Sequence, residues 1–289
     1  MTNTYQYQVV EGWGQKPEDW EWGWMVGIAC DSQDRVFVYS RSQHPLVVFD
    51  REGNFLQTFG DDVLTPGQAH GIFIDADDNV YCTDHRANAI YKFDRHGALQ
   101  MTISNEDMPA DGAGELFDKP TDVGIASNGD IYIADGYGNA RMHKYSASGE
   151  WLLSWGERGD GPGQFELPHG VRVDRYDRVW VCDRENDRIE IFDTEGRFLE
   201  ERTGLLQPNT VHFDPHEDVV YIAELTHQVS IYTLDGELIT KWGGAESSTK
   251  PGEFLGGAHG IWTDSRGDLY VGEVLLDVNG RFQKFSRQR

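Results

Sequence analysis

A motif that recurs six times constrains this chain more than any other feature of its sequence. Each copy opens with a short apolar and β-branched run that ends at a marker position, which recurs as Asp31, Asp75, Ala126, Asp174, Asp214 and Asp264. The intervals between markers are 44, 51, 48, 40 and 50 residues. A repeat of this length, read as four strands per copy, is typical of β-propellers, whose blades are four-stranded sheets.

The copy at residues 168–196 shows the pattern of one blade most clearly. Residues 168–174, 178–183 and 188–192 each alternate or carry β-branched side chains, and polar turns separate them. A further strand is typified by residues 149–156 of the preceding copy. The sequence therefore predicts antiparallel strands joined by tight turns in each copy.

The two ends of the chain predict how the propeller closes. The sixth copy stops after its third strand, and the missing strand stands at residues 7–14, which end in Trp-Gly like residues 155–156 and 242–243. The repeats resemble the NHL type. We therefore expect an all-β, six-bladed NHL β-propeller, built as a single domain over residues 1–289, with the N-terminal strand completing the last blade and covering two sheet edges.

Charge and composition restrict the partners of such a chain. With 25 Lys and Arg against 49 Asp and Glu, the net charge of -24 disfavours nucleic acid, because its phosphates would be repelled. No apolar run of membrane-spanning length and no secretory signal is visible, and the three cysteines (Cys30, Cys82 and Cys182) lie in separate copies. These features predict a cytoplasmic protein with free thiols and no membrane contact, and they carry no signal for an oligomeric state.

Histidines recur at one position of alternate copies. The residue five places before each marker, at the start of the innermost strand, is Val26, His70, Thr121, His169, Asn209 and His259 in turn. Alternate blades of a six-fold ring are related by about 120° around its axis, so three imidazoles would meet there. This set predicts a Zn²⁺ site with an open coordination position, and other divalent transition metals would also suit the imidazoles.

The turn between the second and third strands differs from blade to blade, although its acidic first residue recurs and is expected to cap the turn. Arg41, Tyr137 and Arg184 depart from their equivalents there, and His85 follows the acidic residue of the second blade. Arginines beside a metal favour recognition of a carboxylate, so Arg41, Arg184 and His85 are candidate substrate-binding residues. Tyr137 is a candidate catalytic base, with Arg41 and Arg184 as further catalytic candidates. The segment 20–24, which is rich in tryptophan, is expected to wall an apolar pocket over the site or to pack beneath a loop.

Taken together, these motifs resemble the peptidyl-α-hydroxyglycine α-amidating lyases. The resemblance is strongest at residues 133–141, 168–169 and 183–186, and it includes residues 41–44 and 70–71. It implies that His70, His169 and His259 hold zinc, that Tyr137 is the essential tyrosine, and that Arg41 and Arg184 are the active-site arginines. The implied reaction cleaves the C–N bond of a carbinolamide, an α-hydroxy-N-acylglycine or similar small acid, to an amide and a glyoxylate-type aldehyde.

The chain also departs from that family. Gly260 stands where the family has an aspartate tied to a structural calcium ion, so structural Ca²⁺ is doubtful here, and Gly138 replaces a disulfide cysteine. Two alternatives stay open beside the lyase. One is a metal-dependent hydrolase of an ester, lactone or amide on the same histidines, and the other is a non-catalytic NHL interaction module. The expected partner of either enzyme is a small-molecule or peptide-like carboxylate substrate.

Overall fold

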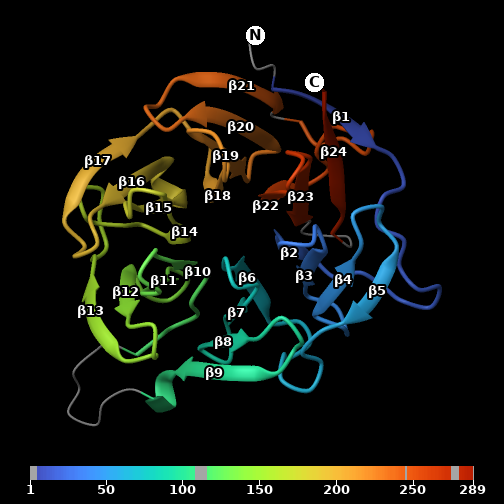
Figure 1. Cartoon of the computed structure of the whole chain (residues 1–289). Coiled ribbons are helices and arrows are strands. Elements are labelled where there is room, and N and C mark those ends of the chain that lie inside the picture. Colours follow the sequence, from blue (N-terminus) through green and yellow to red (C-terminus); the bar gives the residue numbers. More distant parts are fainter. Residues whose placement is uncertain (1–4, 108–115, 245, 275–279, 289) are drawn as a thin grey trace. The chain divides into compact units, whose positions relative to one another are not determined.

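The computed structural model describes residues 5–107, 116–244, 246–274 and 280–288. Within these ranges the chain forms β-strands and two short 3-10 helices, η1 (Asn105–Asp107) and η2 (Arg184–Asn186). The strands make six four-stranded antiparallel sheets, so the protein is an all-β, six-bladed β-propeller, as predicted (Figure 1). The chain divides into two compact units: unit 1 is Met1–Gly67 with Val211–Arg289, and unit 2 is Gln68–Thr210.

Five of the six sheets are built from strands consecutive in the chain. The first blade contains β2 (Met25–Cys30), β3 (Val36–Ser40), β4 (Leu46–Phe49) and β5 (Phe55–Thr58). The second contains β6 (Ala69–Ile74), β7 (Val80–Asp84), β8 (Ala89–Phe93) and β9 (Leu99–Ser104). The third contains β10 (Asp122–Ile125), β11 (Ile131–Asp135), β12 (Arg141–Tyr145) and β13 (Trp151–Trp155).

The fourth blade contains β14 (Pro168–Val173), β15 (Val179–Asp183), β16 (Arg188–Phe192) and β17 (Phe198–Arg202). The fifth contains β18 (Pro208–Phe213), β19 (Val219–Glu224), β20 (Gln228–Thr233) and β21 (Leu238–Gly243), and the boundary between the two units falls within β18. The sixth contains β22 (Gly257–Thr263), β23 (Leu269–Val274) and β24 (Phe282–Gln288).

The N-terminal strand completes the sixth blade, which confirms the predicted closure. Strand β1 (Gln6–Val10) pairs antiparallel with β24, with Gln6 opposite Gln288 and Val10 opposite Lys284, and Figure 1 shows β1 in blue beside β24 in red. Trp13 then packs edge-on against Tyr270 at 5.0 Å between ring centroids and donates its indole N–H to the carbonyl of Arg51. The first strand of the chain therefore leaves β24 no open edge.

The marker aspartates explain why each first strand ends where it does. Asp174 accepts the backbone N–H groups of Tyr176 and Arg178 through Oδ1, and Asp177 in the same turn takes a left-handed φ of 57°. The short carboxylate thus closes the turn from β14 to β15 by bonding backbone donors that would otherwise stay unpaired. The same pairing at Asp31, Asp75 and Asp264 fixes the register of the repeat.

The apolar cores lie between neighbouring sheets. Within unit 2, one cluster joins buried residues of the third and fourth blades, including Tyr132, Phe165 and Phe192. Within unit 1, another joins the fifth and sixth blades around Tyr221, Phe254 and Phe285. Because both faces of the inner strands are buried, those strands are continuously apolar except where a polar residue has a specific partner.

Candidate metal centre

Each of the three aligned histidines lies in a β-bulge near the start of an inner strand. The register shifts by one residue between Pro168 and Gly170 in β14, and equivalent shifts include His70 in β6 and His259 in β22. A bulge takes its extra residue out of the regular alternation and redirects its side chain. All three imidazoles are nonetheless buried, since their exposed fractions are 1%, 2% and 6% for His70, His169 and His259.

One nitrogen of each imidazole is held by a backbone carbonyl. His70 donates through Nδ1 to the carbonyl oxygen of Thr121 at 2.5 Å, and His169 donates through Nδ1 to that of Asn209 at 2.9 Å, both within unit 2. Within unit 1, His259 donates through Nδ1 to the carbonyl of Val26 at 2.6 Å. Because a carbonyl only accepts, Nδ1 of each ring carries a proton, and Nε2 is the nitrogen through which a neutral ring held in this way would bind a metal.

The partners of these bonds repeat as regularly as the histidines. Thr121, Asn209 and Val26 are the three residues that occupy the histidine position in the other blades. Carbonyl–imidazole pairs of this kind commonly orient metal-ligating histidines and fix their tautomer. The three histidines are therefore a donor set suited to a divalent transition metal, whose identity the residues do not specify.

A glycine follows each histidine because the next strand passes too close for a side chain. A Cβ at Gly170 would lie 2.3 Å from the carbonyl oxygen of Asn209, and a Cβ at Gly71 would lie 2.7 Å from that of Thr121. At Gly260 the nearest atom would be the backbone nitrogen of Ile28, at 2.8 Å. The His-Gly pair therefore permits the close approach that brings Nδ1 to its carbonyl.

Tyr137 faces the two aligned histidines of unit 2, His70 and His169. Its hydroxyl oxygen lies 2.8 Å from Nε2 of His70 and 3.4 Å from Nε2 of His169, and the two imidazole centroids are 4.9 Å apart. The phenol has a single O–H to donate, and Nε2 of His70 is the nearer of the two nitrogens. Two ligand nitrogens and one ionisable hydroxyl thus converge, and this convergence fits a metal beside a proton-accepting group.

A buried carboxylate holds the turn that carries Tyr137. Asp135 is fully buried at the end of β11, and it accepts the backbone N–H of Asp118 and the side-chain amide of Asn139 at 2.7 Å. Gly138 donates its N–H to the carbonyl of Asp118 at 2.8 Å, and a Cβ there would lie 2.0 Å from the Asp118 carboxyl carbon. The loop is therefore fixed by hydrogen bonds at the position where the resembling lyases carry a cysteine.

The recurring acidic residues were predicted to cap their own turns, and Asp84 does so by accepting the backbone N–H groups of Arg86 and Ala87. Asp183 instead accepts the backbone N–H groups of Glu166 and Leu167 at 3.0 Å, just ahead of His169. In unit 1, Glu273 accepts the N–H groups of Leu255 and Gly256 ahead of His259. These two carboxylates therefore hold the loops that lead into the strands bearing the histidines.

Two more predicted residues surround Tyr137 in unit 2. The guanidinium carbon of Arg184 lies 6.0 Å from the centre of the Tyr137 ring. The imidazole of His85 lies 6.1 Å from the same ring and 5.9 Å from that of His70, and its Nδ1 donates to the carbonyl of Gln68 at 2.8 Å. The structure thus brings His70, His85, Tyr137, His169 and Arg184 together within one unit.

The remaining predicted residue, Arg41, belongs to unit 1. Its guanidinium lies over the ring of Trp24 at 5.1 Å, and its backbone N–H donates to the carbonyl of Trp24 at 2.9 Å.

Glu185 is a residue of this site that the sequence reasoning missed. Its Oε1 accepts from Nε of Arg184 at 2.9 Å and from Nη2 at 2.8 Å, so it occupies the fork expected to hold a substrate carboxylate. Glu185 itself is exposed, and its other oxygen accepts from the amide of Gln207. A glutamate next to a functional arginine in sequence was the only available signal, and adjacency alone does not predict a bond.

An ion pair beneath the site joins the three inner strands of unit 2. Arg172 of β14 donates to Asp122 of β10 at 2.5 Å and to the carbonyl of Ile72 of β6 at 3.0 Å. Burial raises the pKa of Asp122 despite the opposing effect of Arg172. With both side chains almost wholly buried, the pair is a fixed cross-link between the strands that carry His70 and His169.

Cysteines contribute nothing to this centre. Cys30, Cys82 and Cys182 are free and buried, as predicted, and burial raises the pKa of each thiol. A buried thiol in apolar surroundings stays protonated and is a poor metal ligand.

In the part of the chain that the structure describes, no helix has the length and apolarity needed to cross a bilayer.

Comparison with known proteins confirms the NHL repeat, and the similar proteins include an enzyme of the α-amidating lyase family. The NHL repeat family matches residues 117–145 and 165–192. Human NHL repeat-containing protein 3 is 30% identical over 241 residues, which cover 78% of this chain and 68% of that protein. Peptidyl-alpha-hydroxyglycine alpha-amidating lyase 1 of Drosophila melanogaster is 41% identical over 90 residues, which cover 28% of this chain and 17% of that protein.

Solved structures share the fold at low sequence identity. Virginiamycin B lyase from Staphylococcus aureus superimposes with a TM-score of 0.65 at 13% identity, covering 98% of this chain and 99% of that chain. A gluconolactonase from Xanthomonas campestris gives a TM-score of 0.67 at 14% identity, covering 93% and 88% of the two chains. Such similarity establishes the propeller fold and leaves the chemistry to the residues of the site.

Proposed function

This chain belongs to the family of NHL repeat-containing protein 3, whose repeats it shares, and we propose that it is a catalytic member of that family. The proposed activity is that of a metal-dependent lyase. The observation that carries the proposal is the position of the Tyr137 hydroxyl, within hydrogen-bonding distance of Nε2 of both His70 and His169. A purely structural histidine pair would have no need of an ionisable group at this point.

We propose His259 as the third ligand. It shares with His70 and His169 the β-bulge, the following glycine and the Nδ1 bond to a carbonyl, which together orient the imidazole. Three neutral imidazoles with an open fourth position are the usual protein ligands of catalytic zinc. A bound Zn²⁺ would polarise a substrate oxygen as a Lewis acid.

The proposed reaction cleaves a carbinolamide of the α-hydroxy-N-acylglycine class. Once the Tyr137 hydroxyl has passed its proton to solvent, its oxygen takes the proton of the substrate hydroxyl, the C–O bond becomes C=O, and the C–N bond breaks with its electron pair on nitrogen. The nitrogen then takes that proton from Tyr137, so the products are an amide and a glyoxylate-type aldehyde. Arg184 and Arg41 bind the substrate carboxylate, and His85 contacts the substrate through Nε2.

Glu185 implies that substrate binding at Arg184 is an exchange. The glutamate already accepts two hydrogen bonds from the guanidinium, so a substrate carboxylate must displace it or share the fork. Since Glu185 is exposed and the ion pair is partly solvated, the displacement costs little. The arrangement keeps the guanidinium oriented over Tyr137 until substrate arrives.

The proposal is tested with metal analysis and turnover on the same preparation. Elemental analysis of the purified protein is expected to give about one transition-metal ion per chain, and α-hydroxyhippurate is expected to yield benzamide and glyoxylate in equal amounts. A metal-bearing protein that hydrolyses esters or lactones and leaves carbinolamides intact would show the alternative chemistry. A chain that binds no metal would be the non-catalytic NHL module.

A further inference from the structure

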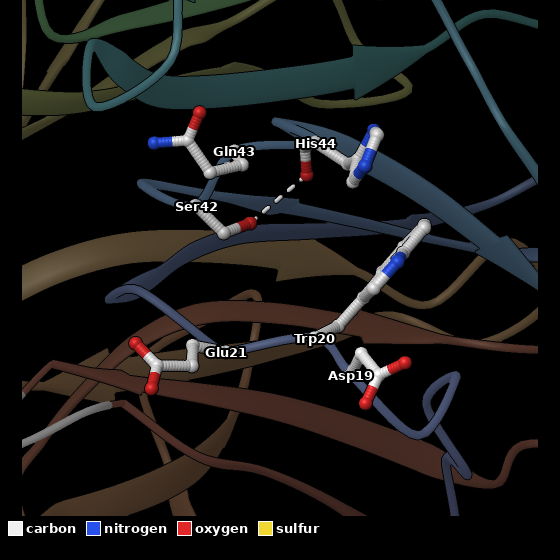
Figure 2. Close-up of a pocket in the computed structure, with 6 residues that line it drawn as sticks. All are labelled: Asp19, Trp20, Glu21, Ser42, Gln43 and His44. Atoms are coloured by element: carbon white, nitrogen blue, oxygen red, sulfur yellow. Dashed lines mark hydrogen bonds between the residues drawn. The ribbon is translucent and has the colours of Figure 1, made fainter.

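A cleft that is lined by none of the three aligned histidines (His70, His169 and His259) opens within unit 1. It has a volume of about 350 Å³ and is lined by Asp19, Trp20, Glu21, Ser42, Gln43 and His44. Figure 2 shows Glu21 and Gln43 on one side of this cleft and Trp20 beside His44 on the other. The space therefore lies between the loop that follows β3 and the tryptophan-rich segment that precedes β2.

The aromatic side of the cleft is held in place. The rings of Trp20 and His44 stack 4.1 Å apart with 18° between their planes, and Trp20 also contacts the edge of Phe55 at 5.4 Å. His44 is anchored through Nδ1, which lies 3.0 Å from a carboxylate oxygen of Asp61. An indole fixed in this way offers a preformed flat surface to a ligand.

The backbone beneath the cleft is equally constrained. Ser42 donates its hydroxyl to the carbonyl of His44 at 2.9 Å (Figure 2). Gly23 packs so closely on the loop that a Cβ there would lie 2.2 Å from the carbonyl oxygen of Arg41. The segment that precedes β2 therefore packs directly on the loop that follows β3, beneath the cleft.

The charges of the lining select the ligand. The cleft presents the carboxylates of Asp19 and Glu21 and contains neither lysine nor arginine among its lining residues. His44 is paired with Asp61, and the amine of Lys16 is engaged by the carbonyl of Trp20. Carboxylates beside an aromatic wall attract organic cations, through charge-assisted hydrogen bonds and contact with the ring, and repel carboxylates and phosphates.

We propose that this cleft is a binding site for an organic cation, a primary ammonium or guanidinium group carried on an apolar stem. The stem lies along the Trp20–His44 side, and the cationic head reaches Glu21 or Asp19. The amide of Gln43 and the hydroxyl of Ser42 supply further polar contacts to groups near the head. This inference is independent of the proposed lyase chemistry, because none of its residues is a metal ligand or a catalytic candidate.

Binding is tested by NMR on the full-length chain labelled with ¹⁵N, with the Trp20 indole resonance assigned by its loss in Trp20→Phe. Phenethylammonium is the probe, and phenethyl alcohol and phenylpropionate are its neutral and anionic counterparts. We expect a saturable shift of the Trp20 resonance with the ammonium compound alone, and a weaker affinity at about 0.5 M NaCl.

Variants test whether the carboxylates of Asp19 and Glu21 bind the cation. Asp19→Asn combined with Glu21→Gln is expected to weaken binding by about tenfold, whereas Glu150→Gln, at an exposed carboxylate of unit 2, leaves it unchanged. The spectrum of each variant away from the cleft reports that it is folded. Equal binding of the alcohol, equal binding by the double variant, or no saturable shift up to about 50 mM probe would each overturn the proposal.

Discussion

The hydroxyl oxygen of Tyr137 lies 2.8 Å from Nε2 of His70, whose Nδ1 donates to the carbonyl of Thr121. The same hydroxyl lies 3.4 Å from Nε2 of His169, whose Nδ1 is held in the same manner. In the proposed lyase this arrangement separates two functions, since the histidines would bind the metal and the tyrosine would move a proton. Each function can be removed alone.

His169→Ala removes a ligand and is expected to abolish metal binding. Two imidazoles hold a divalent ion far more weakly than three, so metal content should fall from about one ion per chain to nearly none. Elemental analysis after gel filtration measures this. His96→Ala, at an exposed position in unit 2, is the matched control. Metal retained at full stoichiometry by His169→Ala would rule out the proposed ligand set.

Tyr137→Phe removes the hydroxyl and keeps the ring. We expect metal content to be unchanged and kcat on carbinolamides to fall by about 10²–10⁴-fold, which is the usual contribution of a general base. Tyr176→Phe, at a largely exposed ring, should keep full activity. If a metallohydrolase were the true activity, Tyr137→Phe would leave the rate nearly intact, whereas His169→Ala would still abolish it.

Gly170→Ala tests the close contact that orients His169. The added methyl group would lie 2.3 Å from the carbonyl oxygen of Asn209, the acceptor of the His169 Nδ1 bond. We expect a loss of about 1–3 kcal/mol in the free energy of unfolding together with weaker metal binding. Thermal unfolding and metal titration measure the two effects.

The control for this substitution is Gly244→Ala, because a Cβ there meets no atom within 4 Å. A stable Gly170→Ala protein with native metal affinity would show that the strands can separate without disturbing the histidine. That result would contradict a steric role for the glycine of each His-Gly pair.

The fold was predictable because its determinants are local and repeated. A marker aspartate that caps a turn works through residues two and four places further along the chain, so its period can be read from the sequence. The histidine positions followed from the same register. Even the exception is explicable: Ala126 has no carboxylate to cap its turn, and the side-chain oxygen of Asn128 accepts the backbone N–H of Asp130 there.

The contacts that complete the site were not predictable, because they depend on the tertiary structure or on the conformation of loops. Nothing in the sequence pairs His70 with the carbonyl of Thr121, since any residue supplies such an acceptor. The ion pair of Arg184 with Glu185 and the bond from Gly138 to Asp118 likewise depend on loop conformation. The tryptophan-rich segment was expected to wall an apolar pocket over the site or to pack under a loop, and Trp20 lines a cleft that is partly acidic.

A buried glutamate outside the site predicts how stability changes with pH. Glu190 of β16 accepts the backbone N–H of Gly163 at 3.0 Å, and its nearest cation, Arg188, is 3.8 Å away. Burial raises the pKa of Glu190 to about 7 from its ordinary value of 4.5. Between those two values the folded chain keeps a proton that the unfolded chain releases, so folding is favoured at the lower pH.

The contribution of Glu190 to stability is therefore full below pH 4.5 and is lost as the pH rises through about 7. Its slope is at most about 1.4 kcal/mol per pH unit in that window. Glu190→Gln keeps an uncharged side chain of the same shape at all pH values, so we expect a flatter pH profile and a more stable protein at pH 8. Urea unfolding from pH 5 to pH 8, with Glu150→Gln as the exposed control, measures the difference. If stability varied with pH in the same way for Glu190→Gln and for the native chain, the proton kept by the folded chain would not be on Glu190.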